Sequence, residues 1–182
     1  LQYSTPMAFS HTISTPTSPK AVLFDAYGTL FDVYSVGLLA DQLFPGQGTA
    51  IATLWRDKQI EYTRLLISST TAGGQTNAPF YKPFWAVTLD ALRYSCAKLG
   101  LDLKANAQER LMNQYRALSA FPENKGVLQA LQTKGIPTGI LSNGDPAMLN
   151  VAISSAGLNG LLALCRAHTP FHPTKPHPAC LR

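Results

Sequence analysis

The sequence predicts an α/β fold, in which an all-α segment is inserted into a parallel sheet. Three observations predict it. A short apolar run at residues 21–24 ends in an acid, helical spacing then dominates residues 33–120, and helices and strands alternate again after residue 120. A chain of 182 residues is long enough for one core with an inserted subdomain.

Residues 1–19 are expected to form a disordered leader. They are rich in Ser, Thr and Pro, show no periodicity and contain no apolar stretch of the kind found in signal peptides. Because the chain opens on Leu1, Met7 is a candidate start residue. Residues 1–6 would then be an artefact of cloning or annotation.

The apolar run 21–24 predicts the first strand, buried on both faces, because aliphatic and aromatic residues follow each other in it without alternation. Asp25 then lies at the carboxyl end of this strand. Ligands bind at this edge of open α/β sheets, so the position of Asp25 favours chemistry over solvation. Gly28 lets the chain turn sharply just after it.

Three helices are predicted in the inserted segment, at 50–68, 84–99 and 105–119, with a loop at 69–79. Gly100 is expected to end the second helix. Most apolar residues of these helices are expected to serve packing alone. The predicted apolar positions are Ile51, Leu54, Trp55, Tyr62, Leu65 and Leu66 in the first helix, Leu89, Leu92, Ala97 and Leu99 in the second, and Leu111, Met112, Tyr115 and Leu118 in the third.

The later part of the chain predicts a helix at 126–135, a strand at 136–141 and a polar turn at 142–144. Asp145 as N-cap and Pro146 at the first helical position start another helix. This strand end repeats the geometry after Asp25, so both strand ends are expected to face one crevice. A last strand is predicted at 161–165, before a proline-rich tail. Doubly wound sheets have about five strands, so part of the fold is expected to be missing at the C-terminus.

Composition argues against several classes of function. The net charge is +5, but the basic residues are scattered, so nucleic-acid binding is not expected. No apolar run is long enough for a membrane span. Three widely spaced cysteines without a CxxC pair fit a reducing cytoplasm. His168, His172 and His177 match no standard metal-ligand spacing, so no metal site is expected.

Asp25 is a candidate nucleophile for carbon or phosphorus, because it stands beside the backbone N–H groups of a glycine-containing turn. Thr29 would orient this carboxylate by a hydrogen bond, and Lys175 would keep it ionised. Ser142, with the amides of the helix start that follows it, would form an anion site. An acid at a strand end is more often a cap or an ion-pair partner, so both interpretations stay open at this point.

Three motifs carry a resemblance to a known family. DAYGTLFD (25–32), LSNGDP (141–146) and Lys175-Pro176 resemble the first three motifs of the haloacid dehalogenase superfamily, over roughly residues 20–178. The resemblance implies a Rossmann-like α/β core at 20–32 and 121–182 and a helical cap at 33–120. Phosphatases of this superfamily carry a second Asp two residues after the nucleophile, where this sequence has Tyr27. This difference argues against phosphoryl transfer.

Tyr27, GTLFDVYSV (28–36) and LWRDKQIEYTRL (54–65) are similar to the (S)-2-haloacid dehalogenases in particular. That subfamily implies attack of Asp25 on C2 of a short 2-haloalkanoate, which gives an ester with inversion. Water then hydrolyses the ester to an (R)-2-hydroxy acid. No metal or organic cofactor is implied, and relatives often form homodimers through the cap.

The resemblance also implies roles for individual side chains. Arg56 would stabilise the leaving halide or hold the substrate, although a solvated arginine at the edge of a helix stripe is the simpler interpretation. Ser142 and Asn143 would bind the substrate carboxylate. The apolar wall around the alkyl group would consist of Tyr27, Ile60 and Phe84.

The sequence departs from the subfamily at several points. Asp57 follows Arg56 where relatives commonly have Gln, and an acid there is unfavourable unless it points away. The loop at 69–79 is longer than usual, and Leu181 replaces a common tyrosine. No Asp or Glu follows Asp145, whereas the fourth motif of the family, which positions the hydrolytic water, should follow Lys175 by a few dozen residues. We therefore expect ester hydrolysis to be impaired in this chain.

Several accounts of the chain stay open. It is a fragment or frameshifted product of an active dehalogenase, a natural truncation that cannot turn over, or a phosphatase-like hydrolase of the same superfamily with altered motifs. A non-catalytic chain that uses its helical cap for protein association is a further alternative.

Overall fold

The structure is a computed structural model that describes residues 18–71, 82–162 and 164–167. Most of the predicted leader and of the loop at 69–79, the proline-rich tail and Lys175 lie outside the described residues.

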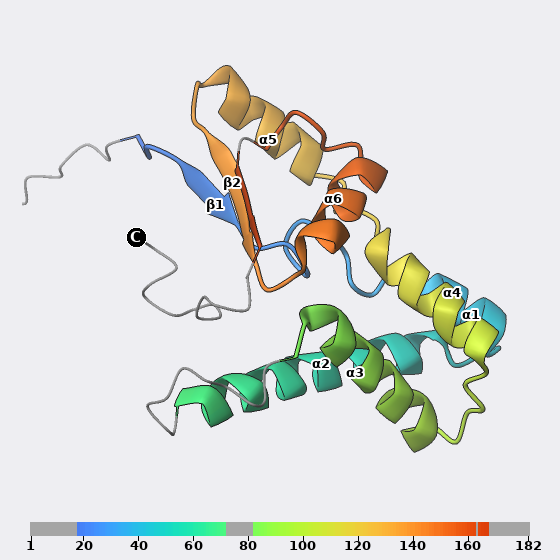
Figure 1. Cartoon of the computed structure of the whole chain (residues 1–182). Coiled ribbons are helices and arrows are strands. Elements are labelled where there is room, and N and C mark those ends of the chain that lie inside the picture. Colours follow the sequence, from blue (N-terminus) through green and yellow to red (C-terminus); the bar gives the residue numbers. More distant parts are fainter. Residues whose placement is uncertain (1–17, 72–81, 163, 168–182) are drawn as a thin grey trace, which may run out of the picture.

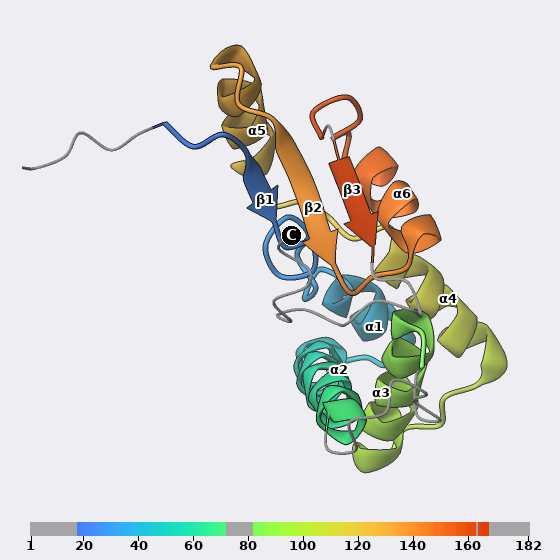
Figure 2. The same cartoon turned by 60° about the vertical axis from the view of Figure 1, so that its left-hand side comes forward.

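The described strands form one parallel sheet in the order β1-β2-β3, as Figure 2 shows. The strands are β1 (Val22–Phe24), β2 (Thr138–Ser142) and β3 (Leu164–Ala167). Phe24 pairs with Ile140, and Ser142 pairs with Ala167. The predicted parallel sheet is confirmed, and its strands point toward the cap helices (Figure 1).

Helices α5 (Asn124–Thr133) and α6 (Pro146–Ser155) cover the same face of this sheet (Figure 1). The prediction that the first strand is buried on both faces is wrong, because Leu23 is 51% exposed. Among the described residues, β1 pairs only with β2 and helices cover only one sheet face, so the Leu23 side chain faces outward. The alternation of half-buried Val22 and Phe24 with exposed Leu23 follows from the two-residue period of a strand.

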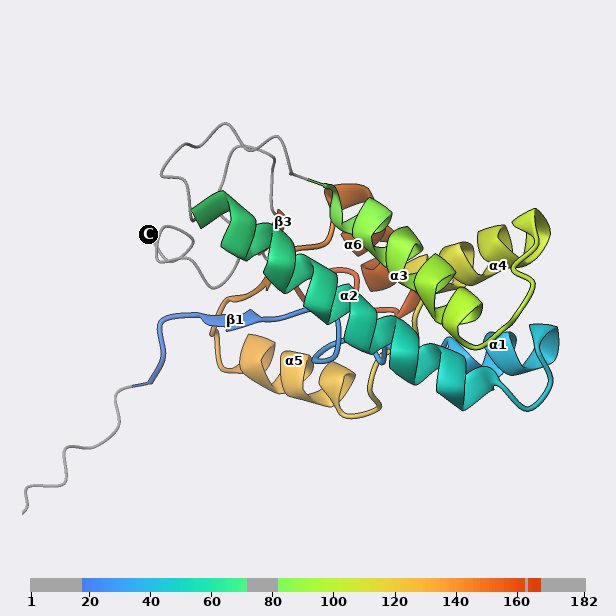
Figure 3. The same cartoon turned by 90° about the horizontal axis from the view of Figure 1, so that it is seen from below.

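Four helices form the cap: α1 (Gly37–Leu43), α2 (Gly48–Thr71), α3 (Phe84–Lys98) and α4 (Ala105–Arg116). Helix α1 was not predicted as an element of its own. Helices α2 and α3 lie side by side (Figure 3), and the indole N–H of Trp55 donates to the backbone oxygen of Thr88 at 2.7 Å between them. Gly100 follows the end of α3 with φ +69°, as predicted. In the described part of the chain, no helix combines the length and the apolar character that a bilayer span requires.

Two predicted packing positions in these helices are wrong. Leu65 is 60% exposed and Ala97 is exposed, although both fit the helical stripes. The last turns of α2 extend past the start of α3 (Figure 3), so α3 does not cover that end of α2. Conversely, the polar side chain of Gln59, which was not predicted to be buried, is only 1% exposed.

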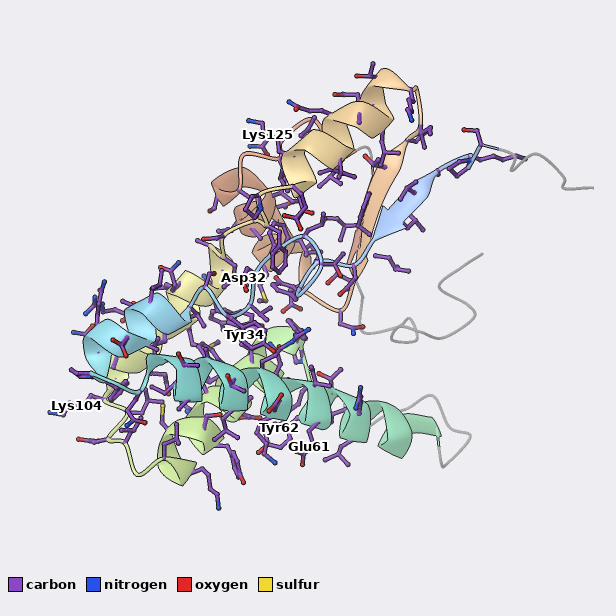
Figure 4. All side chains as sticks on the ribbon, turned by 180° about the vertical axis from the view of Figure 1, so that it is seen from behind. Asp32, Tyr34, Glu61, Tyr62, Lys104 and Lys125 are labelled. Atoms are coloured by element: carbon purple, nitrogen blue, oxygen red, sulfur yellow. The ribbon has the colours of Figure 1, made fainter. Side chains whose placement is uncertain are left out.

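The chain crosses between sheet and cap at two adjacent points. The backbone N–H of Asp32 donates to the carbonyl of Ser119 at 2.8 Å, and that of Phe121 donates to Leu30 at 3.3 Å. Asp32 also accepts from the backbone N–H of Tyr34 at 2.9 Å, on the connection labelled in Figure 4. These crossings lie beside the predicted cap borders, and the division into domains stays a prediction.

Candidate active site

A cavity of about 230 Å³ opens where the strand ends meet helices α2 and α3. It brings together seven residues that the sequence assigned to the site from four separate segments. They are Asp25, Tyr27, Arg56, Ile60, Phe84, Ser142 and Asn143.

Asp25 and Ser142 reach the cavity because their strands are parallel neighbours. Phe24 pairs with Ile140, so Asp25 leaves β1 at the edge where β2 ends in Ser142. After Asp25 the chain folds into a tight turn, in which the N–H groups of Leu30 and Phe31 both donate to the carbonyl of Ala26 at 2.9 Å. The expectation that both strand ends face one crevice is confirmed.

Arg56 extends from α2 to this turn. Its Nη2 donates to the carbonyl oxygen of Tyr27 at 2.8 Å, and its Nη1 donates to Oε1 of Gln59 at 2.8 Å. Gly28 has φ +96°, and a Cβ atom there would lie 3.2 Å from Nη2 of Arg56. The turn therefore needs glycine both for its backbone conformation and for the close approach of the guanidinium.

Aromatic rings form one wall of the cavity. The ring of Tyr27, which is 4% exposed, lies 5.2 Å from that of Phe84 and is stacked at 5.9 Å on that of Tyr115. Behind them, Trp55 packs against Tyr115 at 5.0 Å. A Cβ atom on Gly144 would lie 2.7 Å from Cε2 of Tyr27, so the polar turn after β2 needs glycine to make room for this ring.

The turn after β2 brings polar side chains to the cavity, those of Ser142 and Asn143. The N–H of Gly144 donates to Oγ of Ser142 at 3.1 Å. Oδ1 of Asn143 is buried and accepts no hydrogen bond from the described residues. This side of the cavity therefore suits a ligand with polar groups.

Asp145 occupies the predicted N-cap position before Pro146, but its side chain makes no capping bond to α6. It accepts instead from the backbone N–H of Trp85 in the first turn of α3, at 3.2 Å. Pro83, at the N-cap position of α3, has no side-chain acceptor for this N–H, so a residue from another element supplies one. Asp145 thus has the predicted N-cap position of α6, but its side chain caps the start of α3 instead.

Two predicted site residues do not meet the others in the described structure. Thr29 is exposed and does not line the cavity; its carbonyl accepts from Nδ2 of Asn124 at 3.2 Å. Lys175 lies outside the described residues. The roles of both stay predictions.

Asp57 is exposed and lines a neighbouring hollow instead of the site cavity, so it points away from Arg56.

The cavity also contains Gln59, Thr63 and Arg64, which sequence reasoning missed. For Gln59 and Arg64, a signal exists in the spacing along α2. Gln59 lies four residues after buried Trp55, and Arg64 lies eight after Arg56, so each shares a face with a predicted position. Glu61 and Tyr62, by contrast, lie on the side of α2 turned away from the sheet (Figure 4).

The charges in the cavity suit an anionic ligand that a carboxylate attacks. Asp25 is the only acid among the described lining residues, and Arg56 and Arg64 supply two cations.

Cys96 is no rival nucleophile, because it is fully buried away from the cavity and burial raises the pKa of its thiol to about 11. No cluster of three or more His, Cys, Asp or Glu side chains suited to a metal ion occurs in the described ranges.

The chain is similar to known dehalogenases. Residues 19–182 match the family model of the haloacid dehalogenase-like hydrolases. An (S)-2-haloacid dehalogenase from Pseudomonas sp. (strain YL) is 42% identical over 139 residues, which are 76% of this chain and 56% of that protein. Another from Pseudomonas putida is 36% identical over 77% of this chain and 58% of its own length. The chain thus spans less than two thirds of these two relatives.

Solved structures agree with this similarity. The crystal structure of an L-2-haloacid dehalogenase has a TM-score of 0.80 and 53% identity, covering 90% of this chain and 70% of that one. The L-2-haloacid dehalogenase from Xanthobacter autotrophicus, solved with chloropropionic acid covalently bound, has a TM-score of 0.75 and 34% identity, over 89% of this chain and 62% of that one. The predicted α/β core with a helical cap is confirmed. With its motifs, its parallel sheet and its match over residues 19–182, the chain belongs to the haloacid dehalogenase-like hydrolase family.

Proposed function

We propose that this protein hydrolyses short (S)-2-haloalkanoic acids to (R)-2-hydroxy acids through an ester on Asp25. The observation that carries the proposal is the joint placement of Asp25 and Arg56 in one cavity with an aromatic wall. The similarity to (S)-2-haloacid dehalogenases supports the reaction class. The relative solved with covalently bound chloropropionic acid supports a covalent intermediate.

The reaction consists of two displacements. A carboxylate oxygen of Asp25 attacks C2 of the substrate from the side opposite the halogen, so the C2–oxygen bond forms as the carbon–halogen bond breaks and the halide leaves with the bonding electrons. Water then attacks the ester carbonyl of Asp25, and the C2–oxygen bond stays with the product. The net change consumes one water and releases one halide and one proton. Inversion at C2 converts the (S) acid into the (R) acid.

Each cavity wall has a part in this proposal. Arg56, held at the turn after Asp25, stabilises the leaving halide or the substrate carboxylate. Ser142 and Asn143 bind the carboxylate on the polar side. Tyr27, Ile60 and Phe84 surround the alkyl group and exclude water from the carbon that is attacked. Two further roles belong to the proposal and rest on the sequence alone. Thr29 orients Asp25, and Lys175 forms an ion pair with it.

Tyr27 favours this reaction over phosphoryl transfer. A phosphatase of the superfamily needs a proton donor two residues after its nucleophile, and Tyr27 fills this position with a buried ring packed on Phe84 and Tyr115. We therefore expect no magnesium-dependent release of phosphate from p-nitrophenyl phosphate. Release that Asp25→Asn abolishes would favour the phosphatase alternative.

The test of the proposal is halide release from (S)- and (R)-2-chloropropanoate. We expect release from the (S) acid only, and (R)-lactate as the product of each ester that water hydrolyses. One equivalent of halide per chain reports ester formation, and continued release reports ester hydrolysis. In water enriched in oxygen-18, the first turnover is expected to place the label in Asp25, because water attacks the carboxyl carbon of the ester.

Asp25→Asn is expected to abolish halide release. Asp90→Asn is the matched control, because Asp90 is an exposed acid of the cap paired with Lys82 at 2.7 Å, outside the cavity. Equal halide release by Asp25→Asn and the wild type would refute the nucleophile. In a purely associating protein, Asp25→Asn would leave self-association intact and no variant would release halide.

The proposed partner is the small 2-haloalkanoate itself. A homodimer formed through the cap, the absence of nucleic-acid binding and a cytoplasmic location stay predictions. Light scattering after size-exclusion chromatography tests the homodimer, which would give about twice the mass of the 19.7 kDa chain.

A further inference from the structure

Gln59 lies at the centre of a buried hydrogen-bond network beside the site. The side chain is 1% exposed, one turn after Arg56 on α2. Its Oε1 accepts from Nη1 of Arg56 at 2.8 Å and from the hydroxyl of Tyr115 at 2.9 Å. Its Nε2 donates to Oγ1 of Thr88 at 2.6 Å. The carboxamide thereby joins helices α2, α3 and α4 at the cavity wall.

The neighbours of Gln59 allow its carboxamide only one orientation. The hydroxyl of Thr88 donates to the carbonyl of Phe84 at 2.8 Å, so toward Gln59 it can only accept. Burial raises the pKa of Tyr115 to about 12, so its hydroxyl stays protonated and donates. A flipped amide would place N–H groups against two donors and a carbonyl against an acceptor. Oε1 must therefore face Arg56.

The guanidinium of Arg56 is consequently held at both ends. Nη1 is fixed by the cap through Gln59, and Nη2 is fixed by the turn after Asp25 through the carbonyl of Tyr27. An arginine side chain has many rotamers, and two opposed acceptors select the one that lines the cavity. Without Gln59, Arg56 would keep its contacts to the turn and to the Tyr115 hydroxyl, but Nη1 would lose the carboxamide acceptor that faces it from the cap.

We propose that Gln59 is a positioning residue, which holds the guanidinium of Arg56 in the orientation that ester formation on Asp25 requires. The inference rests on the proposed function for its effect on rate. The holding of Arg56 itself is a property of the fold and can be measured without turnover.

The kinetic test is a double-mutant cycle between Gln59 and Arg56. Gln59→Met keeps the length of the side chain and removes its hydrogen bonds, and we expect it to lower kcat/KM about 30-fold through misplacement of Arg56. In an Arg56→Lys background, the same change is expected to cost less than about threefold, because the group that Gln59 positions is already gone. Equal losses in both backgrounds would overturn the proposal, as would a wild-type kcat/KM for Gln59→Met.

Ser95→Ala is the matched control. Ser95 is also fully buried in the cap and donates to the carbonyl of Ala91 at 2.8 Å, but it does not line the cavity. It is expected to lower the stability of the cap without changing kcat/KM. A loss of activity in Ser95→Ala comparable with that in Gln59→Met would assign the effect to a weakened cap and overturn the positioning role.

A second measurement separates this inference from the proposed function. In nitrogen-15 NMR spectra of the wild type, the two Nη groups of Arg56 are expected to give separate signals, because opposed hydrogen bonds slow rotation of the guanidinium. These signals, assigned by their loss in Arg56→Lys, are expected to merge in Gln59→Met. Unchanged signals overturn the inference. Merged signals with no halide release in any variant support the positioning of Arg56 and refute the proposed function.

Discussion

Arg56 and Gly28 depend on each other at the edge of the site. Helix α2 supplies the guanidinium, while the turn after β1 supplies an acceptor, the carbonyl of Tyr27, and the space that a glycine leaves. Neither residue identifies the contact in the sequence, since 28 positions separate them. The absence of a side chain at Gly28 therefore allows Arg56 of the cap to contact the turn of the core.

Gly28→Ala is expected to lower the free energy of unfolding by about 1–2 kcal/mol, because φ +96° is strained for a residue with a Cβ atom. It should also weaken halide release, since the new methyl group would lie 3.2 Å from Nη2 of Arg56. Urea denaturation and halide assays measure both effects. Gly126→Ala is the control: a Cβ there meets no atom within 4 Å in helix α5, so a gain of about 0.5–1 kcal/mol is expected. Equal stabilities of the two variants would contradict the strain.

Arg64 is expected to attract the anionic substrate. It lines the cavity eight residues after Arg56, on the same face of α2, with Ile60 between them. Because Arg64 is exposed, its contribution is small and screened by salt. Arg64→Gln should raise KM about threefold at low salt and have less effect in 0.5 M NaCl (about a 4 Å screening length). Arg93→Gln is the control, because Arg93 is exposed but outside the cavity; an equal rise in KM for both would assign the effect to net charge.

At the scale of elements, the start of α6 and the start of α3 are joined by one side chain. Asp145 follows β2 in the core and accepts the N–H of Trp85 in the cap at 3.2 Å. Phe84, the neighbour of Trp85, lines the cavity, and so does Asn143, two residues before Asp145. The bond therefore ties the apolar wall to the polar turn of the site.

Asp145→Ala is expected to lower the free energy of unfolding by about 0.5–2 kcal/mol, as the loss of a capping acceptor does at other helix starts. Asp145→Asn keeps an acceptor oxygen and should recover most of this loss. Thermal and chemical denaturation measure it. The exposed ion pair of Lys82 and Asp90 is the comparison, since Asp90→Asn is expected to change stability by less than about 1 kcal/mol. A loss in Asp145→Ala no greater than in Asp90→Asn would show that the bond between α6 and α3 is not stabilising.

At the scale of the whole molecule, core and cap share one hydrophobic cluster. Ile140 and Leu149 of the core belong to the same buried cluster as Trp55 and Leu92 of the cap. Buried groups of the cap that can lose a proton therefore affect the stability of the whole described structure. Tyr115 and Cys96 are two such groups.

We expect the protein to lose stability at high pH. Burial raises the pKa of Tyr115 from 10.0 to about 12, and that of Cys96 from 9.0 to about 11. Between the ordinary and the raised pKa, the unfolded chain releases a proton that the folded protein keeps, so the free energy of unfolding falls as pH rises from 9.0 to about 12. The double variant Tyr115→Phe/Cys96→Ala should show a shallower fall in urea titrations. Identical slopes would contradict this assignment.

Much of the fold was predictable because its signals are local. Strand 136–141 matches β2 within two residues, and the helices at 84–99 and 105–119 match α3 and α4 at their starts. The exposure of Leu23 and Leu65 was not predictable, since it depends on which elements lie over each side chain. The missed burial of Gln59 has the same cause.

The sequence by itself determined the parallel α/β core, the inserted helices and a set of candidate site residues, because strand and helix periods and short motifs are written in neighbouring residues. Only the tertiary structure decided that Asp25, Arg56 and Ser142 share a cavity with Gln59, and that Thr29 is exposed and does not line it. The tertiary structure also decided that the Asp145 carboxylate accepts from the backbone N–H of Trp85. These contacts join segments far apart in the chain, and their geometry exists only once sheet and cap have packed against each other.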